Sequence, residues 1–229
     1  YLPFNMVSIF MIERTQHCVP KDLINRLEFN QFFQMKTSLN APTGDFFYDP
    51  WEIKNEYKNT VWEDILKTLG NNIGQARIII LETEKCYTKH SDIDDRYHLN
   101  LHGDEGYLID LESQKMYHLE NDGVWYYMDA GILHTAASFG QQDRVQLVVR
   151  KLLSRSSLKQ PHFIEIELGG KNPRYVFDNT LSSWLNKANK NSHINNFAVT
   201  DKGCSFEIEA NQLSDLKKLI PKEFQLHHR

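Results

Sequence analysis

The feature that most constrains the fold of this chain is a succession of short strand-like segments in its middle part. From Ala76 onward, runs of apolar or alternating character are separated by turn sequences, among them Gly103–Gly106 and Asn121–Gly123. Short strands joined closely by turns are typical of a β-meander that closes into a sandwich or barrel, of which the cupin-like double-stranded β-helix is one form. The predicted core strands are Ala76–Leu81, Arg96–Leu101, Tyr107–Leu111, Lys115–Leu119, Val124–Met128 and Arg144–Leu152.

The rest of the chain predicts helices before this region and a small α/β unit after it. Apolar residues recur near helical spacing in Lys21–Phe33 and Trp62–Leu69. Residues 154–161 are polar and end in proline, so we interpret them as a linker between a domain of residues 1–153 and an appendage of residues 162–229. In the appendage we expect strands at His162–Leu168, Asn196–Thr200 and Ser205–Ala210, and helices at Thr180–Ala188 and Gln212–Ile220, the last capped by Asn211.

The composition of the 229 residues limits the functional classes. Hydrophobic residues make up 41% and aromatic residues 12%, enough for a hydrophobic core, while no apolar run approaches the roughly 20 residues that span a bilayer. The net charge is −4, and the basic excess of residues 151–229, 12 Lys or Arg against 8 Asp or Glu, forms no run that could follow a phosphate backbone. We therefore expect no membrane and no nucleic-acid partner.

The cysteines bear on the compartment. Cys18, Cys86 and Cys204 lie far apart and form no CxxC pair, so neither a disulfide framework nor a cysteine zinc site is expected. A reducing compartment suits such a chain, and we expect a cytoplasmic protein. The sequence begins at Tyr1, so any targeting segment ahead of it would lie outside this sequence. No pattern predicts an oligomeric state.

His90, Asp92 and His134 form a candidate metal site. A non-haem iron oxygenase holds iron(II) with two histidines and one carboxylate on one face, which leaves the opposite positions for a co-substrate and dioxygen. On a β-scaffold, His90 and Asp92 are two residues apart and can point the same way. We expect His134, from a facing strand, to be the third ligand.

Arg144 supports this interpretation because it lies ten residues beyond His134, at the start of a strand. 2-Oxoglutarate chelates iron through its keto-acid end, and an arginine inside the barrel can bind its far carboxylate through two hydrogen bonds. Arg96 and His98 share one face of their strand and supply further polar groups. Trp125 precedes His134 in the chain and is expected to line the substrate pocket.

Together these motifs resemble the aspartyl/asparaginyl β-hydroxylase superfamily, which includes bacterial proline hydroxylases. The resemblance covers about residues 90–150 and implies a double-stranded β-helix (jelly-roll, cupin-like) core, Fe(II), 2-oxoglutarate and C–H hydroxylation. It implies that His90, Asp92 and His134 hold the iron. It also implies that Arg144 and His98 bind 2-oxoglutarate, and that Arg96 faces the substrate's carboxylate. The motifs that carry the resemblance are His90-Ser-Asp92, Arg96-Tyr-His98-Leu-Asn-Leu, Gly123-Val-Trp-Tyr-Tyr-Met-Asp129, His134-Thr-Ala and Arg144.

The resulting expectation is a mainly β protein with flanking helices and a small C-terminal α/β appendage. It would be an Fe(II)/2-oxoglutarate-dependent dioxygenase, supported by ascorbate, that hydroxylates a free amino acid or an Asp, Asn or Pro residue in a peptide. Asp92 completes the ligand triad and favours a free amino acid, whereas Arg150 stands where an acidic residue is common in the family. Two alternatives stay open: a zinc-dependent hydrolase, which leaves Arg144 and Arg96 unexplained, and a catalytically silent cupin-like module that binds a small acid.

Overall fold

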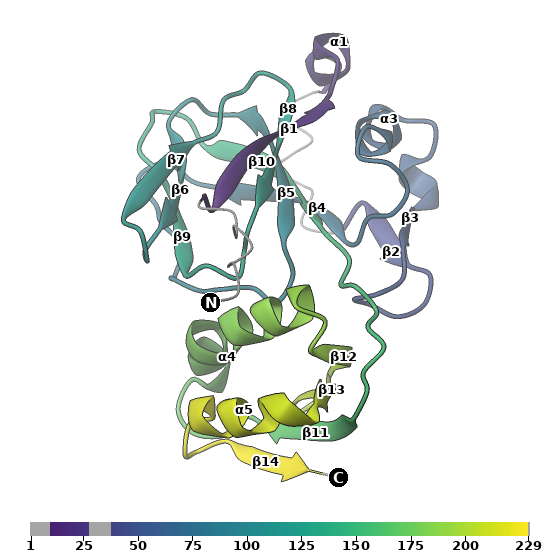
Figure 1. Cartoon of the computed structure of the whole chain (residues 1–229). Coiled ribbons are helices and arrows are strands. Elements are labelled where there is room, and N and C mark those ends of the chain that lie inside the picture. The colour runs from purple at the N-terminus through teal and green to yellow at the C-terminus, as the bar shows by residue number, and fades with distance from the viewer. Residues whose placement is uncertain (1–9, 28–37, 229) are drawn as a thin grey trace, which may run out of the picture.

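The structure, a computed structural model, describes residues 10–27 and 38–228. It consists of a β-barrel followed by a smaller α/β unit, with one long helix between the barrel and the sheet of the appendage (Figure 1). The predicted fold class is therefore confirmed. None of the helices in these residues is long and apolar enough to cross a membrane.

The barrel is a jelly roll of two antiparallel sheets. The larger sheet has the strand order β1-β8-β5-β10-β4, and the smaller has the order β7-β6-β9. Isolated bridges from Cys86 to Ala137 and from His90 to His134 extend the smaller sheet beyond β9. The strands of the larger sheet are β1 (Ile12–Cys18), β4 (Ala76–Leu81), β5 (Arg96–His102), β8 (Val124–Met128) and β10 (Arg144–Arg150), and those of the smaller are β6 (Gly106–Asp110), β7 (Lys115–His118) and β9 (His134–Ser138).

The two faces of the larger sheet differ in chemistry. Residues such as Leu99 and Leu147 are buried on the outer face, where they join a core cluster with the helix α3 (Val61–Lys67). Residues of opposite parity, including His98, Arg144 and Gln146, are also buried but polar. Because successive side chains of a strand point to opposite faces, this alternation directs a row of polar groups into the barrel, as the parity of β5 and β10 predicts.

Described residues between β1 and β4 pack on the outer face of the larger sheet. The predicted helix Lys21–Phe33 is present as α1 (Lys21–Asn25), and its part from residue 28 onward lies outside the described residues. The predicted helix Trp62–Leu69 is confirmed as α3, which buries Trp62 and Ile65. A two-stranded sheet of β2 (Asn40–Pro42) and β3 (Trp51–Ile53), with the short helix η1 (Asn55–Tyr57), completes this part.

The appendage is a four-stranded antiparallel sheet of order β12-β13-β11-β14 packed against two helices. Its core is apolar and includes Ile164, Leu185 and Phe206, none of which is exposed. The predicted cap Asn211 is wrong: it lies in a 3-10 turn, and the helix α5 starts after Gln212 without a side-chain cap. The elements are β11 (Pro161–Glu167), α4 (Pro173–Lys190), β12 (Ile194–Val199), β13 (Gly203–Glu209), η2 (Ala210–Gln212), α5 (Leu213–Leu219) and β14 (Gln225–His228).

The connection between barrel and appendage runs from the end of β10 at Arg150 to the start of β11 at Pro161 (Figure 1). The barrel side contributes to the appendage core, because Phe47, Ile93 and Leu153 belong to the same buried cluster as the helices and strands of the appendage. The two parts therefore share apolar surface. The division at residues 153, 154–161 and 162 stays a prediction.

Candidate metal centre

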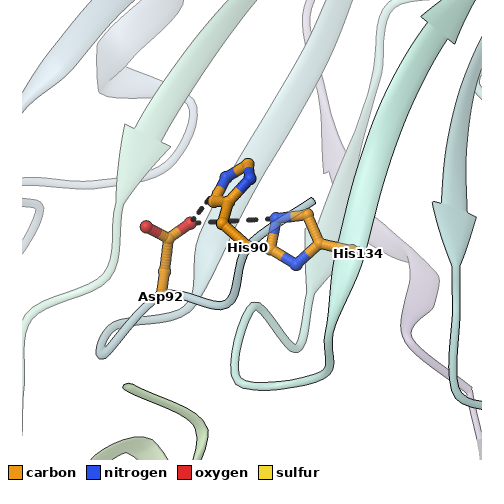
Figure 2. A group of neighbouring side chains, drawn as sticks. All are labelled: His90, Asp92 and His134. Carbon is orange, nitrogen blue, oxygen red and sulfur yellow. Dashed lines mark ion pairs between the residues drawn. The ribbon is translucent and has the colours of Figure 1, made fainter. Parts of the chain in front are cut away.

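Three side chains that are distant in sequence meet at one end of the barrel. His90, Asp92 and His134 each place one ligand atom within 4.8 Å of the other two. The Nε2 atoms of His90 and His134 both lie 3.9 Å from Oδ2 of Asp92 (Figure 2). Among the described residues this is the single cluster of its kind. The fold thus brings together the three residues that the sequence predicts as metal ligands.

Pairing of the backbone fixes the two histidines. His90 and His134 form an antiparallel bridge in which each N–H donates to the other's carbonyl oxygen, at 2.9 and 2.8 Å. Each imidazole Nδ1 lies near the carbonyl oxygen two residues earlier, 2.8 Å from Thr88 and 2.7 Å from Ile132. A carbonyl only accepts, so Nδ1 carries the proton and Nε2 presents a lone pair toward Asp92. Such hydrogen bonds orient the imidazole for a metal ion.

Asp92 is held as a carboxylate by a network of charges. Its second oxygen, Oδ1, lies 2.9 Å from Arg96, which is also 2.9 Å from Asp94, and Asp94 in turn pairs with Arg150. Burial opposes ionisation of Asp92, but the positive charge of Arg96 favours the carboxylate, and the pKa of Asp92 lies below its usual value. The ligand is therefore negatively charged before any metal binds, which favours a divalent cation.

The helix α4 of the appendage holds the loop that carries His90 and Asp92. Ser91, between the two ligands, donates from its backbone N–H (2.8 Å) and its hydroxyl (2.7 Å) to the carbonyl oxygen of Asp178. Farther along the helix, Lys190 lies 2.9 Å from Asp95 and 2.8 Å from Asp129. The geometry of the ligand loop thus depends on contacts outside the barrel.

Arg144 lies inside the barrel with its charge uncompensated. The residue is 2% exposed, and its Nη1 donates to the carbonyl oxygen of Tyr107 at 3.1 Å while its Nε has no partner among the described residues. Burial lowers the pKa of this arginine to about 10. No carboxylate of the described residues forms an ion pair with it, so a buried anion would be strongly favoured beside it.

The space around Arg144 has room for part of such an anion. A cavity of about 90 Å³ is lined by Arg144, His98 and the three candidate metal ligands. The register of β6 with β9 places Asp110 opposite His134 and Tyr107 opposite Ala137. Arg144 contacts Tyr107 on β6, three residues from Asp110. The guanidinium therefore lies roughly 10 Å along the strand from the metal site. A five-carbon diacid that binds a metal at one end spans a distance of this order.

Gly106 is the residue that lets Arg144 pass. A Cβ atom at this position would overlap the Cγ and Cδ atoms of Arg144. Glycine removes that conflict, so the arginine side chain crosses the start of β6 at close range. The position of the Arg144 side chain thus depends on a residue of β6 as well as on β10.

His98 is also buried in this cavity with an unsatisfied atom. Its Nδ1 lies 3.0 Å from Oε1 of Gln146, whereas its Nε2 and the amide nitrogen of Gln146 have no partner among the described residues. Burial lowers the pKa of His98 to about 3, so the ring is neutral. Unpartnered polar atoms at this depth are costly unless a ligand or water satisfies them.

Iron(II) and 2-oxoglutarate both fit the residues present. Two imidazole nitrogens and one carboxylate are a donor set typical of non-haem iron(II). Arg144 and His98 supply the buried, unsatisfied polar atoms that a small dicarboxylate would pair with. The barrel therefore offers one end of such a molecule a metal ion and the other end a cation.

Two predicted substrate contacts have different surroundings from those expected. Trp125 is fully buried on the outer face of β8, in the cluster with α3, and its Nε1 donates to Thr68. This placement corrects the prediction, because the parity of β8 directs Tyr126 and not Trp125 into the barrel. Arg96 lines the cavity but is paired with Asp92 and Asp94, so a contact with substrate stays a prediction.

Sequence reasoning missed several residues that support the site. Asp94 joins Arg96 to Arg150, which explains a basic residue at 150. Ser91 and helix α4 gave no motif, since their contacts arise only in the folded chain. Arg77 could have been found from the sequence, because it is the charged residue in the otherwise apolar segment Ala76–Leu81. Its pairing with Val148 directs its side chain into the barrel.

The fold and the site together define a class: a double-stranded β-helix protein with two histidines and one carboxylate that can hold a metal ion. Residues 55–152 match the family model of aspartyl/asparaginyl beta-hydroxylase. This segment contains the three ligands, Arg96, His98 and Arg144, and it is similar to the aspartyl/asparaginyl β-hydroxylase family. The match confirms the resemblance and supports a hydroxylase.

Two solved structures show similarity to the chain. It is similar to a Pseudomonas putida prolyl-4-hydroxylase, with 11% identity, a TM-score of 0.40 and coverage of 63% of this chain and 89% of that one. It is also similar to CapF, solved with the inhibitor 3-isopropenyl-tropolone, with 13% identity, a TM-score of 0.31 and coverage of 50% and 31%. Among curated proteins, none matches the sequence significantly.

Proposed function

We propose that this protein is an Fe(II)/2-oxoglutarate-dependent dioxygenase that hydroxylates a C–H bond of an amino acid, free or within a peptide. The observation that carries the proposal is the presence of two complementary sites in one barrel. His90, Asp92 and His134 offer two imidazole nitrogens and one carboxylate that would hold the metal, and Arg144 offers a buried cation without a carboxylate partner among the described residues. A metal site alone would suit a zinc-dependent hydrolase equally well.

The residues of the chain have separate tasks in this mechanism. When bound, iron(II) with 2-oxoglutarate supplies the oxidising chemistry, in which dioxygen converts a C–H bond to C–OH and 2-oxoglutarate becomes succinate and carbon dioxide. His90 and His134 present unprotonated Nε2 atoms, and Asp92 presents one oxygen while Arg96 holds the other. Arg144 orients the co-substrate through its far carboxylate, assisted by neutral His98.

A succinate assay tests this proposal. Purified protein with iron(II), ascorbate and 2-oxoglutarate is incubated with free amino acids and with peptides that contain Asp, Asn or Pro. We expect substrate-stimulated succinate that is suppressed in His134→Ala and Arg144→Ala but retained in Arg155→Ala. Arg155 is a suitable control because it is an exposed arginine that pairs with Asp49 and contacts none of the described residues that line the barrel interior.

Other results would support the alternatives. Hydrolysis without any need for 2-oxoglutarate would favour a zinc enzyme. Binding of a small acid without turnover would favour a catalytically silent module. If the wild type binds no iron and forms no succinate above a metal-free blank, the proposal is wrong.

A further inference from the structure

A second and larger cavity lies between the barrel and the appendage. Its volume is about 620 Å³. The barrel side contributes Arg77 and Asp92, the loop between β2 and β3 contributes Phe46, and the appendage contributes Phe177 and Phe197. Aromatic side chains of the loop and the appendage thus face charged side chains of the barrel across the cavity.

This cavity opens toward the metal ligands. Arg77, Asp92 and Arg96 line both the larger cavity and the smaller one inside the barrel. A molecule in the larger cavity would consequently lie next to Asp92, on the side away from Arg144. Position alone makes this the place from which a substrate can present a C–H bond to the metal site.

Most charges that line the cavity already have partners. Arg96 and Arg150 share the carboxylates of Asp92 and Asp94, and Arg174 lies 2.9 Å from Asp178. One oxygen of Asp45, Oδ1, accepts backbone N–H groups from the loop that it begins. The acidic groups of the cavity are thus committed to other residues, and Asp92 also has its role as a ligand.

Arg77 is the exception. Its guanidinium forms no ion pair or hydrogen bond with any side chain that the structure describes, although it projects inward from β4 opposite Val148. Desolvation and the nearby Arg96 lower the pKa of Arg77, whereas the carboxylates of Asp92 and Asp94 raise it. The side chain is exposed and lines the cavity, so its guanidinium is available to an anion that enters there.

We propose that the cavity between barrel and appendage binds the substrate, and that Arg77 pairs with a carboxylate of that substrate. The inference rests on the proposed function and narrows its substrate to a carboxylate-bearing one. A guanidinium presents two parallel donors that match a carboxylate. The carboxylate is either the α-carboxylate of a free amino acid or the side-chain carboxylate of an Asp residue in a peptide.

The apolar walls complete the recognition. Phe46 and Phe47 form cation–π contacts with Arg150, at 4.4 and 4.6 Å from its guanidinium carbon, so their loop is anchored beside the charged network. Phe177 and Phe197 face the cavity from the appendage. The appendage thus forms one wall of the substrate site, which gives this unit a role in substrate selection.

Calorimetric titration tests the proposal with the full chain loaded with Mn(II) and 2-oxoglutarate in the absence of oxygen. The probes with an α-carboxylate are L-aspartate, L-asparagine and L-proline. N-acetyl-aspartic acid amide carries only a side-chain carboxylate. N-acetyl-asparagine amide and L-prolinamide carry none. We expect at least one carboxylate probe to bind and the last two probes to bind at least 10-fold more weakly than it.

Variants of Arg77 locate the interaction. Arg77→Gln should weaken binding of the best probe at least 10-fold, and Arg77→Lys should restore part of the loss because it restores the charge. Arg155→Gln, an exposed arginine outside the cavity, is the matched control and should bind as the wild type does. Thermal unfolding of each variant checks that the fold is retained.

The outcomes separate this proposal from the function on which it rests. Equal binding of carboxylate and carboxylate-free probes, no binding by any carboxylate probe, or wild-type affinity in Arg77→Gln would overturn the role of Arg77. Absence of succinate in the presence of iron(II) and 2-oxoglutarate, with Arg77-dependent binding of a carboxylate probe intact, would instead overturn the proposed reaction and leave the binding site standing.

Discussion

Replacement of Arg144 by methionine should weaken the binding of 2-oxoglutarate and at the same time stabilise the protein without ligand. The arginine is 2% exposed and has no carboxylate partner among the described residues. Loss of one member of a buried, hydrogen-bonded charge pair costs about 2 to 5 kcal/mol of binding energy. At about 1.4 kcal/mol per factor of ten, the Kd for 2-oxoglutarate should rise roughly 30-fold to several thousand-fold.

The opposite effect on stability follows from the same burial. Burial lowers the pKa of Arg144 from 12.5 to about 10, and a pKa lower by one corresponds to about 1.4 kcal/mol. The charged form therefore destabilises the folded chain at neutral pH by about 3 kcal/mol, from which the lost hydrogen bond to Tyr107 subtracts about 1 kcal/mol. Arg144→Met should raise the free energy of unfolding by about 1 to 2 kcal/mol.

Two measurements decide the matter. Urea unfolding of the metal-free protein gives the stability change, and calorimetry with Mn(II) and 2-oxoglutarate without oxygen gives the affinity. Arg155→Met, at an exposed ion pair with Asp49, should change neither by more than about 1 kcal/mol. If Arg144→Met binds 2-oxoglutarate as tightly as the wild type, Arg144 is not its anchor. If the variant is less stable than the wild type, the buried charge is compensated within the folded protein and the expected gain is refuted.

Three further predictions concern residues around the site. Ser91→Ala removes the hydroxyl that donates to Asp178 at 2.7 Å and should weaken Mn(II) binding about 10-fold, measured by metal titration; unchanged affinity would show that α4 does not position the loop. Gly106→Ala would crowd Arg144 and should raise the Kd for 2-oxoglutarate while Mn(II) affinity stays within a factor of about two, equivalent to about 0.4 kcal/mol. His98 is neutral when folded because burial lowers its pKa to about 3; the unfolded chain therefore takes up the extra proton, and this contribution to stability is complete above about pH 6.5 and lost as the pH falls toward 3. His98→Gln should accordingly lose about 2 kcal/mol less stability than the wild type between pH 7 and pH 5 in urea unfolding, and equal losses would contradict a buried neutral ring.

The β-core was predictable because its strands carry their pattern locally. Ala76–Leu81 and Val124–Met128 have the predicted bounds, and Arg144 lies at the start of a strand, as expected. The strand His134–Ser138 was not assigned, because Thr-Ala-Ala-Ser lacks an apolar alternation and becomes a strand only by pairing with Gly106–Asp110. Long-range pairing of this kind leaves little trace in the local sequence.

The candidate site was predictable in part for the same reason. His90, Asp92, His134 and Arg144 stand in a recognisable order and spacing, so they could be named. Arg96 could be placed on the same face as His98, but its pairing with two aspartates follows from the loop conformation. The position of Trp125 on the outer face could have been predicted from the alternation of β8. Val124, Tyr126 and Met128 point to one face of this strand, so Trp125 points to the other.

The metal centre includes contacts from α4, which lies outside the segment that carries the ligands. Residues 55–152 carry every predicted ligand, yet the peptide between His90 and Asp92 is hydrogen-bonded to a helix that begins at Pro173. The same helix neutralises Asp95 and Asp129 through Lys190, beside the loop and before β9. A carbonyl and an ammonium group of this one helix contact both segments that carry ligands, so we expect the distance between Asp92 and His134 to depend on the position of α4. Metal affinity and access to the cavity lined by Phe177 are therefore expected to be coupled through this helix.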